Sequence, residues 1–435
     1  MIRILTTFLA ILLAILVLMA CQPAPPPYPG IAPWSDGLLI GQARRLDAPA
    51  AAWNGQAWLA AWADASTLFA RQVWPEQASA TPSPLLTDRQ PWAPVLLPAT
   101  DGEWHLLWNE VDSFEQTHLF SAHLQADSTL SRGPMPVTAD ATGSSAAALD
   151  GSGGVIILWV ATGGDRPVLY GQQLDAQSRP LAGPAPLVAP SAEYPALART
   201  AEGRWVMAWL ALPDSPHNPA DSRDVVIQIS ESVLPWQEPG KPVIIGRATL
   251  SDPALYIESV ALGLDRSFGY LFVNRRDARN YAAQTEVYSF PLSGGESSLP
   301  ANVAPLLVRF PAAASATSGS FTTGFNTGPA LVAGDVADPA NLPAGGAYPV
   351  QGQHEVLPVA FTADRRLIIG YFQGGVLAAY QNVATAPGAI GGLNLSADRD
   401  RHLTIAWTSL PHSSEDPASL LLSTTRPISA PSTRP

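Results

Sequence analysis

An aromatic phrase that recurs along the chain is the feature that most constrains its fold. The runs "GQAWLAAW" (55–62), "GEWHLLW" (102–108), "GGVIILW" (153–159) and "GRWVMAW" (203–209) share one pattern. Each ends in a tryptophan, and these anchors, spaced 46, 51 and 50 residues apart, are Trp62, Trp108, Trp159 and Trp209. Weaker copies end at Phe272, Phe372 and Trp407. A period of this length indicates a repeat architecture with seven units.

Each unit carries the signs of about four short strands. In the second unit the apolar run "PVLLPA" meets a turn at Asp101-Gly102, and the alternating run "HLFSAHL" follows the anchor. Asp-Gly between two short apolar runs is a hairpin signal. The chain also has 43 Pro and 34 Gly in 435 residues and only 14% charged residues, which favours short strands and tight turns over long helices.

A strand meander that repeats every 40 to 50 residues or so predicts an all-β fold, namely a β-propeller. A pair of β-sandwiches would also show strands at short intervals, but the regular period of this chain disfavours it. The alternating run occurs eight times against seven anchors, and the surplus copy, "LLIGQARRL" (38–46), is the first. We therefore expect an N-terminal strand to pair with the last blade and close the ring.

The expected number of blades is seven, with six and eight as open alternatives. The repeat is lost in residues 293–355, which are rich in Gly, Ala, Ser and Pro. This segment is either a degenerate blade or an insertion, and we favour the insertion.

The anchor tryptophans allow two interpretations. They could form a platform on which sugar rings stack, or they could pack between neighbouring blades. An aromatic residue at the same place in every repeat is typical of core packing, so we favour the second interpretation.

The amino terminus has the pattern of an export signal. Met1 to Arg3 give a positive start, Ile4 to Ala20 are apolar apart from two threonines, and Cys21, the only cysteine, follows. Leu18, Met19, Ala20 and Cys21 occupy the places of a lipobox, and the segment resembles a bacterial lipoprotein signal. The resemblance implies that Cys21 is lipidated and becomes the first residue of the mature protein. An uncleaved signal anchor and an incidental thiol are the alternatives.

The expected organisation is a signal peptide (1–20), a lipidated cysteine with a Pro-rich tether (21–33), and a propeller domain (34–435). The resemblance implies a location in the cell envelope, on the outer side of the cytoplasmic membrane or in an outer membrane. No disulfide can form, because the chain has a single cysteine, so stability has to come from a large core.

The longer segments after the anchors are expected to lie on one face of the ring, together with the connections between blades. Unequal, charged loops on a rigid scaffold are where recognition usually resides. The candidate ligand-face residues are Glu110, Asp112, Asp165, Arg166, Asp214, His217, Arg275, Arg276 and Asp277. Ordinary solvated loops are the alternative for any one of them.

Motifs for catalysis are sparse. The sequence has no HExxH, GxSxG or phosphate-binding loop, and we predict no metal and no cofactor. A net charge of −12 disfavours nucleic acid as a partner. Our first hypothesis is a monomeric, membrane-anchored propeller that binds an envelope protein or a glycan. The alternative is a propeller glycoside hydrolase or a related polysaccharide-active enzyme, for which Asp398 and Asp400 are one carboxylate pair.

Overall fold

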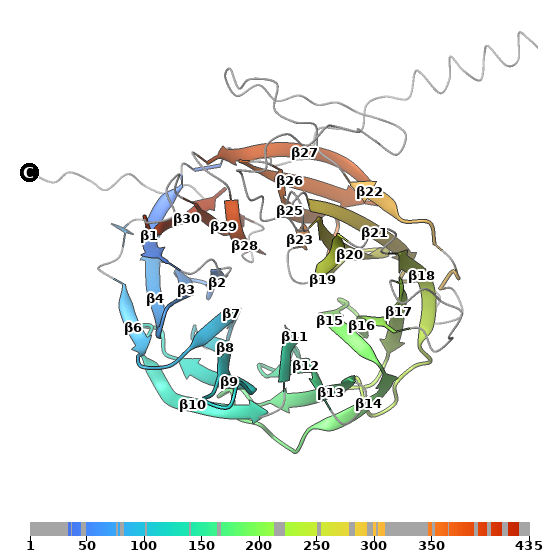
Figure 1. The fold of residues 1–435 in the computed structure, drawn as a ribbon, viewed down its shortest axis with the longest axis horizontal. Coiled ribbons are helices and arrows are strands. Elements are labelled where there is room, and N and C mark those ends of the chain that lie inside the picture. Colours follow the sequence, from blue (N-terminus) through green and yellow to red (C-terminus); the bar gives the residue numbers. More distant parts are fainter. Residues whose placement is uncertain are drawn as a thin grey trace, which may run out of the picture. The chain divides into compact units, whose positions relative to one another are not determined.

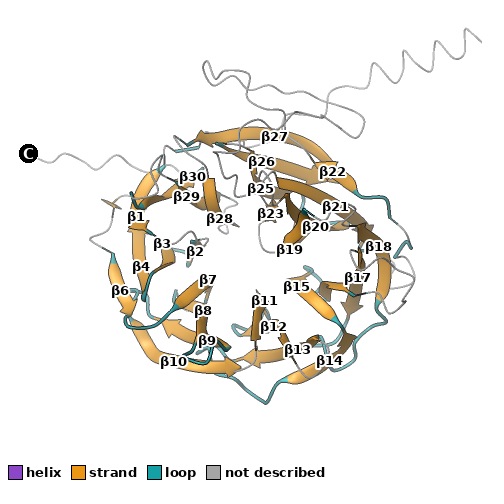
Figure 2. Cartoon of the chain, viewed as in Figure 1, coloured by secondary structure: helices purple, strands orange, loops and turns teal. Residues whose placement is uncertain are grey.

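In the computed structural model the chain divides into two compact units, residues 1–33 and residues 34–435. The structure describes residues of the second unit, namely 34–425 except 36, 45–48, 75–76, 79–81, 101, 139–140, 163–166, 213–221, 250–253, 278–282, 294–298, 302, 309–346, 350–352, 364, 387–389, 398–401 and 411–415. The expected signal, Cys21 and tether therefore lie outside the described residues. Throughout the described part the regular structure is strand, without helix (Figure 2).

Seven sheets are arranged as the blades of a β-propeller around a central axis (Figure 1). We name the strands of each blade A to D from the innermost outward. In chain order, blade 1 contains β2 (Ala50–Trp53), β3 (Trp58–Asp64), β4 (Thr67–Trp74), and the two outer strands β5 (Gln77–Ala78) and β6 (Ser83–Leu86). Blade 2 contains β7 (Pro91–Pro98), β8 (Trp104–Val111), β9 (Thr117–Leu124) and β10 (Leu130–Thr138). Blade 3 contains β11 (Ala141–Leu149), β12 (Val155–Thr162), β13 (Pro167–Leu174) and β14 (Ala185–Pro190).

The remaining blades follow the same order of strands. Blade 4 contains β15 (Ala192–Arg199), β16 (Trp205–Ala211), β17 (Ser222–Ser230) and β18 (Val243–Thr249). Blade 5 contains β19 (Leu255–Asp265), β20 (Phe268–Asp277), β21 (Ala283–Pro291) and β22 (Leu306–Val308), with β24 (Gln353–His354) beside β19. Blade 6 contains β23 (Ala347–Pro349), β25 (Leu357–Ala363), β26 (Arg366–Gln373) and β27 (Val376–Thr385). Blade 7 contains β28 (Ile390–Ala397), β29 (Leu403–Ser409), β30 (Ala418–Thr424) and β1 (Leu38–Ala43).

The N-terminal strand closes the ring, as the sequence predicted. β1 pairs antiparallel with β30, with Leu39 opposite Leu421 and Ala43 opposite Ala418, and so forms strand D of the last blade. The backbone N–H of Ser35 extends this pairing by donating to the carbonyl of Thr424 at 2.8 Å. The seven-bladed, all-β propeller is thereby confirmed, and it joins the two ends of the described chain in one sheet.

The anchor side chains form the core between blades. All seven are buried, with at most 3% of their surface exposed. Trp62, Trp108 and Trp159 each stack on an aromatic ring of strand C, with ring centroids 5.7, 5.7 and 5.9 Å apart. Each buried indole removes about 200 Å² from water, which contributes roughly 5 kcal/mol before entropic costs. The core interpretation is confirmed, and a sugar platform made of these tryptophans is wrong.

Two anchors differ from the expected frame. In blade 5, Leu271 and Val273 pack toward blade 4, so Phe272 points the other way and meets Phe361 and Phe372 of blade 6. In blade 6, Phe372 lies on β26, which is strand C and not strand B. Both runs are apolar on both faces, so the sequence has no alternation that could fix the frame.

The irregular segment 293–355 contributes strands to two existing blades. β22 is strand D of blade 5, β23 is strand A of blade 6, and β24 pairs in parallel with β19. Its described residues therefore form no sheet of their own, and the count of blades stays at seven.

The antiparallel order of strands defines two faces of the propeller. We call "the B–C face" the one that carries the B–C connections and the links between blades, and "the C–D face" the one that carries the A–B and C–D connections. The hairpin at Gly102 lies on the C–D face. There the N–H of Ala99 donates to the carbonyl of Glu103 at 2.9 Å, and Gly102 has a φ of 82°. The loop thus has three residues with glycine last, and not the two-residue turn that Asp-Gly suggests.

Candidate functional site

Three of the predicted ligand-face residues have described side chains, and all three lie at the B–C face. Glu110 is the second-to-last residue of strand B of blade 2, Asp112 follows that strand, and Arg275 is near the end of strand B of blade 5. Arg276 and Asp277 belong to β20, but their side chains are outside the description. Asp165, Arg166, Asp214 and His217 fall outside the described residues, as do Asp398 and Asp400.

In blade 2, Glu110 is a structural acceptor. Its carboxylate pairs with Arg89, at 3.0 Å from Nη1, and accepts a hydrogen bond of 2.6 Å from the indole N–H of Trp108. The guanidinium of Arg89 also lies 5.3 Å from the ring centroid of Phe120. Arg89 was not among the predicted residues, because it belongs to the link between blades 1 and 2. The pair joins these two blades at the rim.

Asp112 shapes the loop that follows. Its carboxylate accepts from the backbone N–H groups of Phe114 at 2.8 Å and Gln116 at 2.9 Å, and it lies 2.8 Å from Nε2 of His118. The hydrogen bond with His118, followed by those of the backbone, holds the pKa of Asp112 below its usual value. The carboxylate is occupied by its own loop, which it fixes in one conformation.

Two groups of ionisable side chains lie at the B–C face where blades 4 and 5 meet: Glu193 with Arg223 on blade 4, and Arg275 with Glu286 and Tyr288 on blade 5. We call the two groups together "the blade 4–5 cluster". Arg223 donates to Glu193 and Arg275 to Glu286, both at 2.6 Å, and the hydroxyl of Tyr288 donates to Glu286 at 2.9 Å. Of these residues, sequence reasoning found Arg275 alone.

Strand alternation places this cluster on the surface where the two blades meet. Arg223 is two residues from Val225, and Arg275 is two residues from Val273, so each pair points to the same side of its blade. Val225, Val273 and Tyr288 belong to the apolar core shared by blades 4 and 5. The cluster is therefore the polar rim of an apolar interface. Partial burial there strengthens each ion pair and penalises an unpaired charge.

Glu286 is the carboxyl group of the cluster whose protonation is shifted. Its side chain is 15% exposed, and that of Arg275 is 7% exposed. Burial raises the pKa of Glu286 above that of an ordinary glutamate, although Arg275 and the hydroxyl of Tyr288 act in the opposite direction. Burial, with the negative charge of Glu286, likewise raises the pKa of Tyr288. Glu286 thus keeps its proton to a higher pH and still has part of its surface in water.

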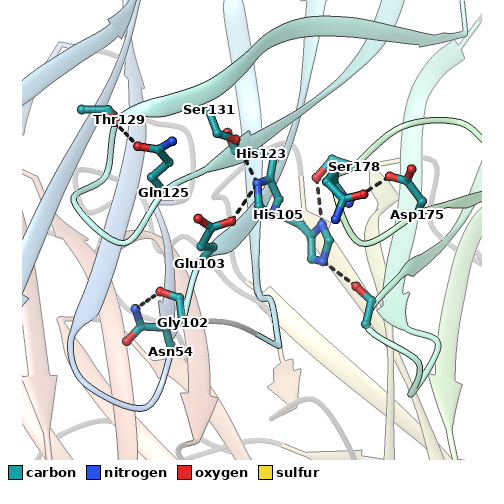
Figure 3. A network of polar contacts seen from close by, with 12 residues as sticks. Asn54, Gly102, Glu103, His105, His123, Gln125, Thr129, Ser131, Asp175 and Ser178 are labelled. Atoms are coloured by element: carbon teal, nitrogen blue, oxygen red, sulfur yellow. Dashed lines mark hydrogen bonds and ion pairs between the residues drawn. The ribbon is translucent and has the colours of Figure 1, made fainter.

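A second polar group lies on the opposite, C–D face, between blades 2 and 3 (Figure 3). His105 on β8 and His123 on β9 are buried, with ring centroids 5.6 Å apart. Nδ1 of His105 is 2.8 Å from Oγ of Ser178, and Nδ1 of His123 is 3.1 Å from Glu103. These contacts connect strands and turns of two blades, which is a structural role.

The described residues contain no group of three or more His, Cys, Asp or Glu side chains placed to hold a metal ion. In this same part of the chain there is also no helix of the length and apolar character needed to cross a membrane.

Comparisons with known proteins identify no family for the chain. No family model matches it, and no curated protein matches its sequence. Among solved structures, a GH43_1 enzyme from Xanthomonas citri is 13% identical with a TM-score of 0.37, covering 62% of this chain and 94% of its own. A polysaccharide lyase, an ulvan lyase, is 10% identical with a TM-score of 0.48, covering 90% and 94%. A protein of unknown function from Dyadobacter fermentans is 11% identical with a TM-score of 0.45, covering 77% and 94%.

Enzymes that are named for action on polysaccharides recur among these structures, including an endo-1,4-β-xylanase from Bacteroides thetaiotaomicron. This is the class that the sequence analysis held as its alternative to a binding module. Such distant likenesses assign neither a family nor an activity to this chain.

Proposed function

We propose that the protein is a polysaccharide-active β-propeller whose reaction takes place at the blade 4–5 cluster. The observation that carries the proposal is the carboxyl group of Glu286, which is partly exposed, has a raised pKa and lies on a rigid strand. A perturbed carboxyl group among charged partners at a protein surface is a candidate for acid–base chemistry.

The chemistry of glycoside cleavage fits the groups that are present. The leaving oxygen needs a proton from an acid, and a second carboxylate acts on the other side of the sugar ring. Glu286 is the candidate acid, because its raised pKa keeps the proton available. Glu193, which pairs with Arg223 at 2.6 Å on the facing blade, is the candidate second carboxylate. The arginines and Tyr288 would position sugar hydroxyl groups.

The test uses the full chain and Glu286→Gln with a panel of polysaccharides, beginning with xylan and ulvan. We expect the wild type to release new reducing or unsaturated ends, and the variant to lose about 100-fold or more of that rate, which is typical of a lost general acid. The wild-type rate should fall as the pH rises through the pKa of Glu286, because only the protonated acid donates.

The matched control is Glu110→Gln, which removes a similarly buried carboxylate and its arginine pair in blade 2. Thermal unfolding of both variants shows whether each is still folded. An equal loss of rate in the two variants, or a wild type inactive on the whole panel, would contradict the enzymatic proposal.

The second candidate is a binding module for a glycan or an envelope protein. It is favoured by the pairing of both glutamates of the cluster with arginines, which suits a fixed recognition surface as well as a reactive one. Affinity electrophoresis and pull-down from envelope extract separate the two functions. A binding module would retain its ligand without product, and would bind equally well with Glu286→Gln if the ligand lies elsewhere.

We also propose that Cys21 is lipidated and holds the protein in the cell envelope, outside the cytoplasmic membrane. The support is the lipobox-like order Leu18, Met19, Ala20 and Cys21 at the end of an apolar run. Labelling of growing cells with a fatty acid should mark the wild type, and Cys21→Ser should lose both the label and stable membrane attachment. Equal labelling of the two proteins would refute the lipid anchor.

A further inference from the structure

Large apolar side chains are exposed at the C–D corners of five blades. They are Leu39 near the start of β1, Trp74 at the end of β4, Leu181 and Val233 in the C–D connections of blades 3 and 4, and Val376 at the start of β27. Their exposed fractions are 48%, 37%, 57%, 79% and 57%. We call these five residues "the apolar rim". Of the nine exposed large apolar residues of the described chain, more than half are therefore at one kind of corner.

Hydrogen bonds fix three of the corners that carry the apolar rim, those of Leu181, Val233 and Val376. The carbonyl of Val233 accepts from the indole N–H of Trp205 at 3.0 Å, and the N–H of Leu181 donates to the carbonyl of Gln173 at 3.0 Å. The turn before Val376 is held in the same way, with the N–H groups of Gly374 and Gly375 donating to Asp265 and Tyr270 of blade 5. At these three corners the exposure is thus a consequence of the hydrogen-bonded turn geometry.

The polypeptide enters the propeller on the same face. Ser35 pairs with Thr424 at the C–D end of blade 7, and β1 then runs from this face toward the B–C face. Residues 21–33 number thirteen and are rich in proline. A polyproline segment of that length spans about 40 Å, at roughly 3.1 Å per residue. Whatever holds Cys21 therefore stays within about that distance of the point of entry.

We propose that the C–D face of the propeller lies against the surface of the lipid bilayer that holds Cys21, with the apolar rim dipping into the headgroup region. This inference rests on the lipid anchor proposed above. Apolar residues spread around five blades fit a plane better than a globular partner, which would need one contiguous patch. Tryptophan suits the boundary between lipid and water, where the ring meets apolar chains and the N–H meets headgroups. Insertion of apolar side chains into the headgroup region does not depend on attraction to anionic lipids, which a protein with a net charge of −12 would lack.

This placement of the C–D face would also orient the proposed reaction site relative to the bilayer. The blade 4–5 cluster, on the B–C face, would point away from the bilayer and toward material outside it. A polymer could then reach the cluster without passing between the propeller and the membrane.

The test compares two matched positions in the lipidated full chain. Val233 is 79% exposed on the C–D face, and Phe114 is 80% exposed on the B–C face. The variants Val233→Cys and Phe114→Cys are each labelled with an environment-sensitive fluorophore, since acylated Cys21 does not react. The proteins are reconstituted in phosphatidylcholine vesicles that carry a spin-labelled lipid as quencher.

We expect the label at position 233 to be quenched at least about twofold more than the label at position 114, because interfacial insertion brings it to the depth of the quencher. Equal quenching at the two positions, in protein that floats with the vesicles, would overturn the orientation and leave the anchor intact. Failure of the wild type to float would overturn both the anchor and the inference. Circular dichroism of the labelled proteins shows that each has kept its β-structure.

Discussion

At the scale of single residues, Asp150 shows how one carboxylate organises a turn of this propeller. Its Oδ1 accepts hydrogen bonds from the N–H of Ser152 at 2.7 Å and of Gly154 at 2.9 Å, and its Oδ2 accepts from Gln173 at 3.0 Å. Burial acts to raise the pKa of Asp150, but the hydrogen bonds from Ser152, Gln173 and Gly154 outweigh it and hold the pKa below its usual value. The A–B hairpin of blade 3 is thus tied to strand C.

Asp150→Ala is expected to lower the free energy of unfolding at neutral pH by about 1 to 3 kcal/mol, because the buried N–H of Gly154 and the partly buried donors of Ser152 and Gln173 lose their acceptor. A carboxyl group with a lowered pKa in the folded state stabilises it above the pKa of the unfolded chain, about 3.9. That contribution is lost as the pH falls through the folded pKa. Urea unfolding at neutral and at acidic pH should therefore show a difference between the two proteins that shrinks on acidification.

The control for Asp150 is Asp127→Ala. Asp127 makes similar bonds to Thr129 in the C–D turn of blade 2, but that turn is exposed to water. We expect a smaller loss of stability there. If Asp127→Ala lost as much stability as Asp150→Ala, the loss would come from the missing turn hydrogen bonds themselves and not from the burial of the donors.

Individual site residues could be located from the sequence only in part. Glu110 and Arg275 were found because they closely follow the anchors Trp108 and Phe272, although both lie within strands and not in the loops expected there. Their partners were missed for a physical reason: each pair forms through the pairing of strands or the stacking of blades. Glu286 is reached from Arg275 through the hairpin register, in which Arg275 faces Gln284. Once that register is known, Glu286 can be recognised as the partner of Arg275, because it lies two residues beyond Gln284 on the same face of the hairpin.

At the scale of elements, β1 depends on a glycine that lets it lie against a tryptophan. A Cβ atom on Gly41 would stand 2.5 Å from the indole ring of Trp62, which is closer than side chains pack. Trp62 belongs to blade 1, and β1 to blade 7, so this contact joins the first blade to the last. The close contact between β1 and the indole ring of Trp62 therefore helps to close the ring of blades.

Gly41→Val is expected to destabilise the protein by about 1 to 3 kcal/mol, the usual cost of overpacking a core. Its effect should be local to the seam, so limited proteolysis would cut near β1 before the other blades. Gly37→Ala is the matched control on the same approach to blade 7, since its Cβ would find its nearest neighbours at 3.4 Å. Unchanged proteolysis in Gly41→Val would count against a seam held by this contact.

The strands of blades 1 to 4 and 7 could be predicted from their anchors, whereas those of blades 5 and 6 could not. In "RRLIIGYF" (365–372) the six residues after the two arginines are all apolar or glycine, so nothing in the run distinguishes strand B from strand C. Strand A of blade 6 is only Ala347–Pro349. Three such residues have no pattern of their own, and their pairing with β25 decides their conformation.

At the scale of the whole molecule, stability depends on closing a ring without any cross-link. β1 buries Ile40 in the core between blades 7 and 1, and its loss would leave β30 as an open edge. A chain that begins at residue 47 should therefore unfold at a lower temperature than the full chain. An added peptide of residues 34–46 should bind to it and restore part of the difference, as strand addition to a sheet edge does.

The measurement is thermal unfolding with and without the peptide, and a peptide carrying Gly41→Val is the control. Restoration by both peptides alike, or by neither, would contradict the specific role of this strand in closure.

The closure of blade 7 also sets an order in time. Leu39 leaves the ribosome early, yet it pairs with Leu421, about 380 residues later in the chain. Contacts between such distant residues form slowly, because the entropy of closing a long loop is lost before the contacts stabilise the chain. The first strand has to wait, unpaired, until almost the whole polypeptide has been synthesised. If the chain is exported from its N-terminus, as proposed above, its first blade would spend that interval on one side of the membrane and its last blade on the other, and folding could then finish only after transport.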